Sequence, residues 1–218
     1  MLSYQEAKTY YDAFGKKQDK QFYEKAALEK LLHHGMFQKA ENIIEFGCGT
    51  GKVAHTILLE CASEKTHYTG LDISQTMIDL TRKRLSEFEE RVKVYRTDGA
   101  PIIPEKDESF DRFVSTYVFD LLNENDIKEG LKEAHRILKS DGYLCLSGLT
   151  NGISVLSRFV EKLWRSLHQR NPSIVGGCRP IHLIQYLANE QWEIIHHSVI
   201  ISFGVPSEVV IAKKRMAG

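Results

Sequence analysis

The chain reads Ile43-Ile44-Glu45-Phe46-Gly47-Cys48-Gly49-Thr50-Gly51 at residues 43–51, and this stretch decides the fold. An apolar run, an acidic residue and three glycines at alternate positions predict a buried strand that ends in a tight turn. The apolar positions between Val53 and Leu58 then predict the start of a helix. Glycine suits such a turn because it tolerates positive φ, and the backbone N–H groups at the start of a helix are free to meet a ligand.

An acidic residue at the end of the next strand suggests what this turn binds. Thr66 to Leu71 is a second strand-like run, and Asp72 follows it, 21 residues after Gly51. An acid at this place can accept hydrogen bonds from both hydroxyls of a ribose. Glycines also punctuate ordinary loops, but the pairing of turn and acid favours a nucleoside site. The dinucleotide fingerprint has a third glycine where Lys52 stands, which disfavours an NAD-type oxidoreductase.

Strand and helix patterns alternate through the middle of the chain. The strands are apolar on both faces, which is typical of a parallel sheet covered by helices on both sides. After the first strand, the sequence predicts strands at Thr66–Asp72, Val92–Thr97, Ser109–Thr116 and Tyr143–Gly148, and helices at Gln75–Glu89, with Ser74 as its N-cap, and at Asn125–Lys139.

The pattern changes after the fifth strand. The sequence predicts a long amphipathic helix from Ile153 to Leu167, a Pro/Gly loop at Asn171–Pro180 and a short helix at Ile181–Asn189. Two β-rich runs follow, Trp192–Ile201 and Glu208–Ala212, joined by the four residues 203–206. The connection is too short for a parallel crossover, so these two strands should be antiparallel.

Residues 3–40 lie outside the strand–helix alternation and predict two helices, separated by a break at residues 15–19. Tyr10, Tyr11 and Phe14 form an aromatic cluster on the first of them. Two interpretations stay open: the cluster patches the apolar face of the core, or the segment is a lid over a bound ligand.

Composition and charge narrow the functional classes. The chain has 218 residues, 29 basic and 29 acidic side chains and 42% hydrophobic residues, which fits one domain with a sizeable core and gives no electrostatic footprint for nucleic acid. No apolar run is long enough to span a membrane, and Met1 to Asp12 lacks an apolar signal core. The four cysteines show no C-x-x-C spacing, and His196 and His197 should point to opposite faces of a strand. We therefore expect a cytoplasmic protein with reduced thiols and no metal site.

The motif E-x-G-C-G-T-G at residues 45–51 resembles the first motif of class I S-adenosyl-L-methionine (SAM) dependent methyltransferases. Matching pieces follow at 70–74, 98–100, 109–111 and 133–142, in the order seen in the branch that contains quinone-biosynthesis C-methyltransferases. The family usually has a proline and a glycine where Ser140 and Asp141 stand, which affects only a turn away from the site. The resemblance implies a Rossmann-like α/β fold, with a seven-stranded, mostly parallel sheet and a C-terminal antiparallel hairpin.

The resemblance also implies a single domain and a set of SAM-binding residues. Residues 1–40 would be a helical lid or cap, 41–150 the SAM-binding core, 151–190 the substrate-side helices and loop, and 191–213 the C-terminal strands. Asp72 would hold the ribose, Asp98 the adenine amino group, and Glu45 would lie near the methionine amino group. The full cofactor set is Glu45, Gly47, Cys48, Gly49, Gly51, Asp72, Ile73, Met77, Asp98, Gly99, Ala100, Thr116 and Tyr117.

The implied reaction is methyl transfer from SAM to a small acceptor by in-line displacement, with S-adenosylhomocysteine (SAH) as product. The segments expected to face the acceptor are aromatic and aliphatic, so the acceptor should be apolar or amphiphilic. No catalytic base is assigned; the candidates by position are Tyr117, Asp120 and His182, and Asp120 can instead cap the following helix. A non-catalytic SAM-binding module that works through a partner is the alternative. The substrate-side candidates are Tyr11, Phe14, Tyr117, Asp120 and His182.

Overall fold

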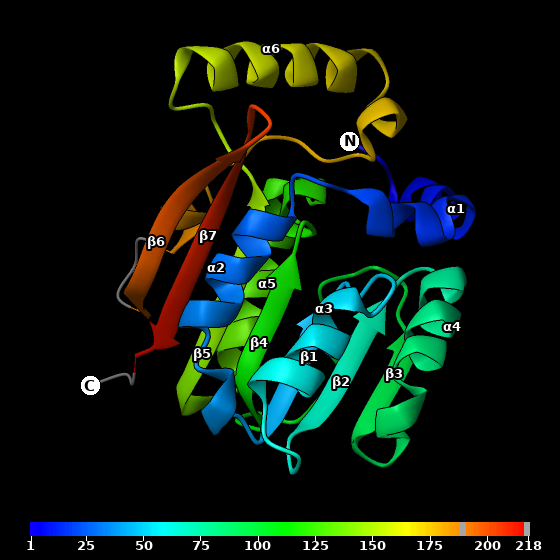
Figure 1. Ribbon diagram of the computed structural model, residues 1–218, viewed down its shortest axis with the longest axis vertical. Helices are drawn as coiled ribbons and strands as arrows, with labels where there is room; N and C mark the ends of the chain where they lie inside the picture. The colour runs from blue at the N-terminus through cyan, green and yellow to red at the C-terminus, as the bar shows by residue number, and fades with distance from the viewer. Residues whose placement is uncertain (188–190, 216–218) are drawn as a thin grey trace.

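The computed structural model describes residues 1–187 and 191–215, and its centre is one seven-stranded sheet in the order β3-β2-β1-β4-β5-β7-β6 (Figure 1). The pairs among β1 to β5 are parallel, while β7 is antiparallel to both β5 and β6. This confirms the class I architecture with its C-terminal hairpin. The strands are β1 (Asn42–Phe46), β2 (His67–Asp72), β3 (Val92–Arg96), β4 (Phe110–Thr116), β5 (Leu138–Leu149), β6 (Trp192–Ser202) and β7 (Val205–Lys214).

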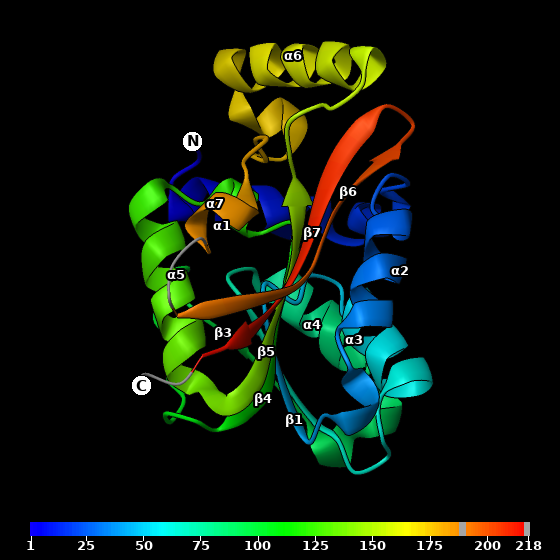
Figure 2. The same cartoon turned by 90° about the vertical axis from the view of Figure 1, so that its left-hand side faces the viewer.

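Helices cover both faces of the sheet (Figure 2). α5 and α7 pack on one face, and α2, α3 and α4 pack on the other. Successive strand residues point to opposite faces, so Leu144 belongs to the first core and Cys145 to the second. The helices are α1 (Tyr4–Phe14), α2 (Lys25–His34), α3 (Lys52–Thr56), α4 (Gln75–Arg84), α5 (Glu124–Ile137), α6 (Val155–Arg170) and α7 (Leu183–Tyr186), with short turns η1 (Gly15–Lys20), η3 (Ile57–Cys61), η5 (Phe119–Leu121) and η6 (Pro172–Val175).

The helices predicted near the two ends of the chain are present. The two predicted N-terminal helices are present as α1 and α2, with η1 at the predicted break. The helix predicted at Ile181–Asn189 corresponds to α7, which runs from Leu183 to Tyr186. The last two residues of the predicted helix, Ala188 and Asn189, lie outside the described residues.

The C-terminal hairpin is tighter than predicted. Its turn consists of Phe203 and Gly204 alone, because Ser202 already pairs with Val205. Both turn residues have positive φ, 53° and 84°, which is the backbone of a type I′ turn and matches the twist of the two strands. The four-residue connection predicted at 203–206 was therefore wrong, and β7 begins at Val205.

Helix boundaries in the core also differ in places. Ser74 is the N-cap of α4 as predicted, since its hydroxyl accepts a hydrogen bond from the Met77 N–H at 3.2 Å. However, α4 ends at Arg84 rather than Glu89, because Leu85 leaves helical geometry and a 3-10 turn follows. Strand β5 starts at Leu138, directly after α5, five residues before the predicted start at Tyr143.

A buried arginine ties β4 to the end of α2. The Arg112 guanidinium donates to the carbonyl oxygens of Gly35 at 2.8 Å and Met36 at 2.6 Å. It also lies over the Tyr143 ring, 4.6 Å from its centroid. The Arg112 side chain is almost completely buried, so its hydrogen bonds to these two carbonyl groups are shielded from water.

We expect Arg112→Met to destabilise the fold by about 1.5–3 kcal/mol, because it leaves the two carbonyl groups without their charged donor. Urea unfolding measures the change, and Arg96→Met is the matched control, since Arg96 lies exposed on β3 and should shift stability by less than about 0.5 kcal/mol. Equal stability of the two variants would contradict this role for Arg112.

Candidate functional site

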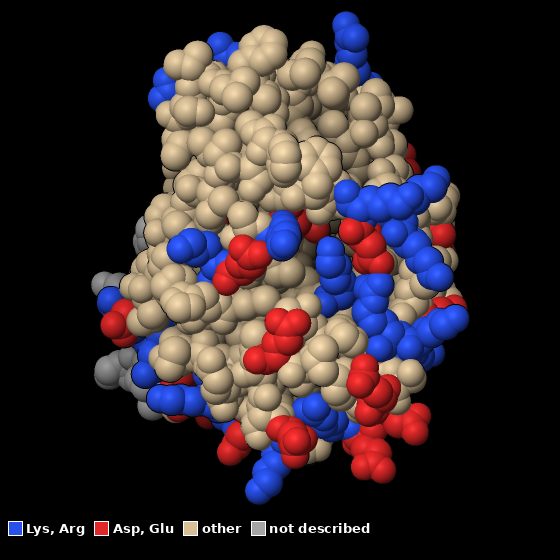
Figure 3. Space-filling model, in the orientation of Figure 1, with Lys and Arg blue, Asp and Glu red and all other residues tan. Residues whose placement is uncertain are grey.

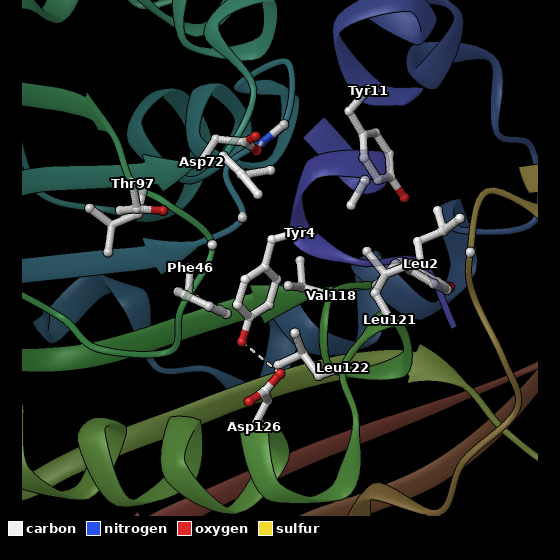
Figure 4. A pocket seen from close by; sticks show the side chains of 18 of the residues that line it. Leu2, Tyr4, Tyr11, Phe46, Asp72, Thr97, Val118, Leu121, Leu122 and Asp126 are labelled. Atoms are coloured by element: carbon white, nitrogen blue, oxygen red, sulfur yellow. Dashed lines mark hydrogen bonds between the residues drawn. The ribbon is translucent and has the colours of Figure 1, made fainter. Parts of the chain in front are cut away.

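A cavity of about 400 Å³ lies at the carboxyl ends of the parallel strands, where open α/β sheets bind their ligands (Figure 4). Its walls come from the strand ends, from the turn after β4, from α1 and from the loop after η6. The lining residues are Met1, Leu2, Ser3, Tyr4, Ala7, Tyr11, Gln18, Phe46, Gly47, Gly49, Leu71, Asp72, Ile73, Thr97, Gly99, Thr116, Tyr117, Val118, Leu121, Leu122, Asn123, Asp126 and Gly177.

The glycine turn forms one wall of this cavity and requires glycine for two reasons. Gly47 and Gly49 have φ of 80° and 53°, which L side chains rarely adopt. There is also no space, since a Cβ at Gly47 would collide with Val118 and one at Gly49 would lie 2.8 Å from Oε1 of Gln18. The backbone of the turn is therefore exposed to a ligand at close range.

Asp72 stands beside the turn at the end of β2. Its Oδ2 accepts from the Gly49 N–H at 2.9 Å and its Oδ1 from the Ser74 N–H at 2.8 Å. These bonds fix the carboxylate at the cavity wall with lone pairs left for a ligand. Burial raises the pKa of Asp72 to about 6, against the opposing effect of the backbone N–H groups.

Four other residues of the predicted cofactor set lie behind the turn, away from the cavity lining. Glu45 is buried and accepts from the Tyr68 hydroxyl at 2.6 Å, and burial raises the pKa of Glu45 to about 8. The Cys48 sulfur is 3.8 Å from Oγ1 of Thr81, which also packs against Gly51, and Met77 is fully buried. Direct contact of these side chains with a cofactor stays a prediction.

The segment after β3 borders the same cavity. Ile73, Thr97 and Gly99 line it, whereas Asp98 is exposed and accepts from the Ala100 N–H at 3.0 Å in a turn of its own. The placement of Ile73 and Gly99 beside Asp72 fits the predicted adenine end. The roles of Asp98 and Ala100 stay predictions, and Thr97 is a lining residue that the motifs did not single out.

At the end of β4, Thr116 and Tyr117 both line the cavity. Tyr117 adopts a φ of 55°, and its hydroxyl donates to Oγ of Ser207 on β7 at 2.8 Å. The hydroxyl is therefore engaged in the protein interior, and burial raises the pKa of Tyr117 far above its ordinary value. Tyr117 contributes a ring surface here, and its hydroxyl is poorly placed to take a proton from an acceptor.

Of the other four substrate-side candidates, Tyr11 lines the cavity, whereas Phe14, Asp120 and His182 do not. Tyr11 lines the cavity, and its hydroxyl donates to the Gly176 carbonyl oxygen at 3.0 Å. Phe14 instead stacks on Tyr10, with 5.4 Å between ring centroids. His182 lies outside, with Nε2 2.7 Å from the Asn151 amide nitrogen.

Asp120 is completely buried beneath the cavity and does not line it. Its Oδ2 accepts from the Leu149 N–H at 3.0 Å, and burial raises the pKa of Asp120 to about 7. The N-cap of α5 is Asn123 and not Asp120, because Oδ1 of Asn123 accepts from the Asp126 N–H.

The N-terminal segment closes the outer side of the cavity. Seven lining residues come from residues 1–18. The Tyr4 hydroxyl donates to Oδ2 of Asp126 on α5 at 2.7 Å, across the cavity (Figure 4). No motif could point to Tyr4 or Asp126, because they are 122 residues apart in sequence; the aromatic composition of this segment was the only signal.

Two aspartates anchor the segment at further points. Oδ1 of Asp12 accepts from the Ser74 hydroxyl at 2.6 Å, next to Asp72. Asp19 binds Thr50 at 2.6 Å and forms an ion pair with Arg84 at 2.5 Å. The segment is thus fastened to α4, to α5 and to the glycine turn.

Among the described residues, no group of three or more His, Cys, Asp or Glu side chains has the arrangement of a metal site. His197 contacts Glu208, while His196 stacks on His34, so the two adjacent histidines do point to different partners.

Within residues 1–187 and 191–215, none of the helices has the length and hydropathy needed to cross a membrane.

Comparison with known proteins shows which proteins this sequence is similar to. Residues 43–142 match the family described as "Methyltransferase domain". Demethylmenaquinone methyltransferase of Thermotoga maritima is 28% identical over 172 residues, which is 78% of this chain and 66% of that protein. The ubiquinone/menaquinone biosynthesis C-methyltransferase UbiE of Bartonella quintana is 31% identical over 131 residues, 56% of this chain and 46% of that protein. The chain thus spans about half to two thirds of these curated relatives.

Solved structures show the same fold. The N-methyltransferase NodS of Bradyrhizobium japonicum, in complex with SAH, superposes with a TM-score of 0.70 at 14% identity, over 92% of this chain and 91% of NodS. Together with the sheet order and the glycine turn, the match of residues 43–142 confirms the resemblance found in the sequence: this part of the chain is similar to the methyltransferase domain family, and the whole sheet has the fold of class I SAM-dependent methyltransferases.

Proposed function

We propose that the protein transfers a methyl group from SAM to a small apolar or amphiphilic acceptor by in-line displacement. One observation carries the proposal: a single cavity joins the glycine turn and Asp72 at one end to the aliphatic side chains of Leu2, Leu121 and Leu122 at the other. The first end suits a nucleoside and the second an apolar molecule. Two substrates held in one cavity can be aligned for displacement, which is the main requirement of the reaction.

The charge of the cavity supports the same donor. Asp72 and Asp126 are its acidic lining residues, and no Lys or Arg belongs to the described lining. A negative wall favours the positively charged sulfonium of SAM, and the rings of Tyr4 and Tyr11 offer further favourable surface. A polyanionic acceptor, or the pyrophosphate of NAD, would meet no basic side chain here.

The relatives support an apolar acceptor. Two of them are named for steps of quinone biosynthesis, and quinones are largely apolar rings. Because this chain spans only part of these proteins, the acceptor class rests on the cavity wall rather than on the names.

The first test is ligand binding. We expect SAH to raise the stability of the protein by mass action, by about 2.7 kcal/mol at 100 times its Kd, while NAD at the same concentration has no effect. Thermal-shift titration measures both, and absence of a shift at millimolar SAH would contradict the cofactor assignment. Transfer of tritium from methyl-labelled SAM into a metabolite extract then separates an enzyme from a non-catalytic SAM-binding module.

A further inference from the structure

One end of the molecule carries a continuous apolar surface that no part of the described chain covers. It consists of four residues of α6, the turn of the β6–β7 hairpin and one residue after η1, each between 53% and 88% exposed. We call this surface the α6 patch, formed by Val155, Leu156, Phe159, Leu163, Phe203 and Phe22.

The patch is continuous because its three parts touch. Phe22 and Phe203 meet edge to face, with ring centroids 5.0 Å apart. Next to Phe203, the backbone of Gly204 packs so closely on α6 that a Cβ there would lie 3.0 Å from Val160 and 3.6 Å from Leu156. Figures 1 and 2 show α6 lying across this end of the molecule beside the hairpin turn.

The outward face of α6 carries exposed apolar side chains where an ordinary surface helix is polar. A helix on a globular protein turns its apolar stripe inward and its polar residues outward. Here Trp164 and Val160 face the protein and pack on its third apolar cluster, while Val155 and Phe159 are also apolar and face outward. Contiguous exposed apolar patches mark sites of interaction.

Charge says which kind of partner fits. Residues 150–180 contain five Lys or Arg and one acid, Glu161. That acid is mostly buried and paired with Arg165 at 2.8 Å. Among the described residues, Arg158 and Lys162, which alternate with the apolar residues along α6, form no ion pair. In Figure 3 the upper end of the molecule is mostly uncharged, with Lys and Arg at its edges.

We propose that the α6 patch docks on the surface of an anionic lipid bilayer. An amphipathic helix with bulky apolar residues and flanking Lys or Arg lies in the bilayer interface, with apolar side chains among the acyl chains and basic ones at the headgroups. A second copy of the chain fits less well, because a two-fold contact places the same patch on both sides and so gathers the Arg158 and Lys162 side chains of both copies around one interface.

The patch is mechanically connected to the cavity. On the inner side of α6, Nε1 of Trp164 donates to the Cys178 carbonyl oxygen at 2.9 Å, and Nε2 of His168 lies 3.2 Å from the Gly177 carbonyl oxygen. Gly177 itself lines the cavity and packs against Leu2 and Leu121 at its apolar end. Docking would therefore bring the apolar end of the cavity close to the lipid. Entry of a lipid-dissolved acceptor at this end rests on the proposed function, whereas the docking itself does not.

The test is co-sedimentation of the full chain with vesicles of phosphatidylcholine alone and of phosphatidylcholine with 30% phosphatidylglycerol, at low and high salt. We expect binding to the anionic vesicles that weakens with salt. Phe159→Glu with Leu163→Glu should reduce the partition coefficient at least tenfold. The matched control is Leu59→Glu with Ile102→Glu, because these two side chains are 57% and 71% exposed and lie outside the patch.

A second pair of variants tests the charge without touching the apolar residues. Arg158→Gln with Lys162→Gln should weaken binding to anionic vesicles by about 25-fold, since each basic residue near such a surface contributes roughly fivefold. Lys25→Gln with Lys132→Gln, on exposed faces of α2 and α5, is the control and should leave binding unchanged.

Three outcomes would overturn the proposal: no binding to either vesicle, equal loss in patch and control variants, or a dimer in light scattering that Phe159→Glu with Leu163→Glu makes monomeric. SAH-induced thermal stabilisation, measured on the same variants, shows that the fold and the cofactor site are intact. Vesicle binding needs no methyl transfer, so failure of the docking and failure of the proposed function give different results.

Discussion

Replacing Asp72 by asparagine is expected to weaken SAH binding by about 10- to 100-fold, because a hydrogen bond to a charged acceptor contributes roughly 1.5–3 kcal/mol. The amide oxygen can keep a backbone bond from Gly49 or Ser74, so the turn should retain its shape while the charge is lost. Isothermal titration calorimetry measures the change. Asp79→Asn, on the exposed side of α4, is the control, and equal affinity of the two variants would show that Asp72 is not the ribose ligand.

The pH dependence of SAH binding is the sharper readout for Asp72. With its pKa near 6, the carboxyl is largely protonated at pH 5 and ionised at pH 7.5. Because the ionised form is the acceptor for ribose, SAH affinity should rise over this range, and Asp72→Asn should remove that part of the slope. The free energy of unfolding should change with pH in the opposite direction to the SAH affinity. Because the pKa of Asp72 is raised from 3.8 to about 6 by folding, Asp72 contributes stability below pH 4, and this contribution is lost as the pH rises through 6.

Removal of residues 1–20 is expected to lower turnover at least 100-fold while the protein stays folded. None of the residues of α1 or η1 is fully buried, so the truncation removes little core. The same residues form the outer wall of the cavity, and methyl transfer depends on excluding water and aligning the acceptor. Tritium transfer measures turnover, and thermal unfolding measures stability.

This truncation also decides between the two interpretations of the N-terminal aromatic cluster. If the segment only patches the core, stability falls with and without SAH; if it is a lid, SAH slows proteolysis near Gly15 and turnover alone is lost. Asp12→Ala with Asp19→Ala should loosen the lid without deleting it, and Lys17→Ala, an exposed residue of η1, is the control. Full activity of the truncated protein would contradict the lid.

The sequence predicted those parts of the site that depend on local backbone geometry. Gly47, Gly49 and Asp72 meet in the structure because a glycine turn after one parallel strand and an acid after the next must lie at the same sheet edge. Met77 and Cys48 show the limit of this argument. They belong to the same motif region, yet the motif does not fix where they point: the Cys48 sulfur lies beside Thr81 in the second core, and Met77 is fully buried.

Contacts between residues far apart in the chain could not be predicted from the sequence. The direction of the Tyr117 hydroxyl follows from the pairing of β5 with β7, which places Ser207 within reach. The bond between Tyr4 and Asp126 joins the start of the chain to the middle. Neither residue pair is marked by spacing or residue type, so only the folded chain brings these groups together.

If the N-terminal segment is a lid, the contacts of Tyr4, Asp12 and Asp19 set how often the cavity opens. Tyr4, Asp12 and Asp19 each make contacts that are exposed or half-buried, and pairs of this kind contribute only about 0–1 kcal/mol each. The three contributions together amount to about 0–3 kcal/mol, so contacts of this strength alone would leave an open form populated at roughly 0.6–50% without ligand. A lid with such a population would let SAM enter and SAH leave without global unfolding, and a bound ligand would shift the balance toward the closed form only as far as it binds that form more tightly.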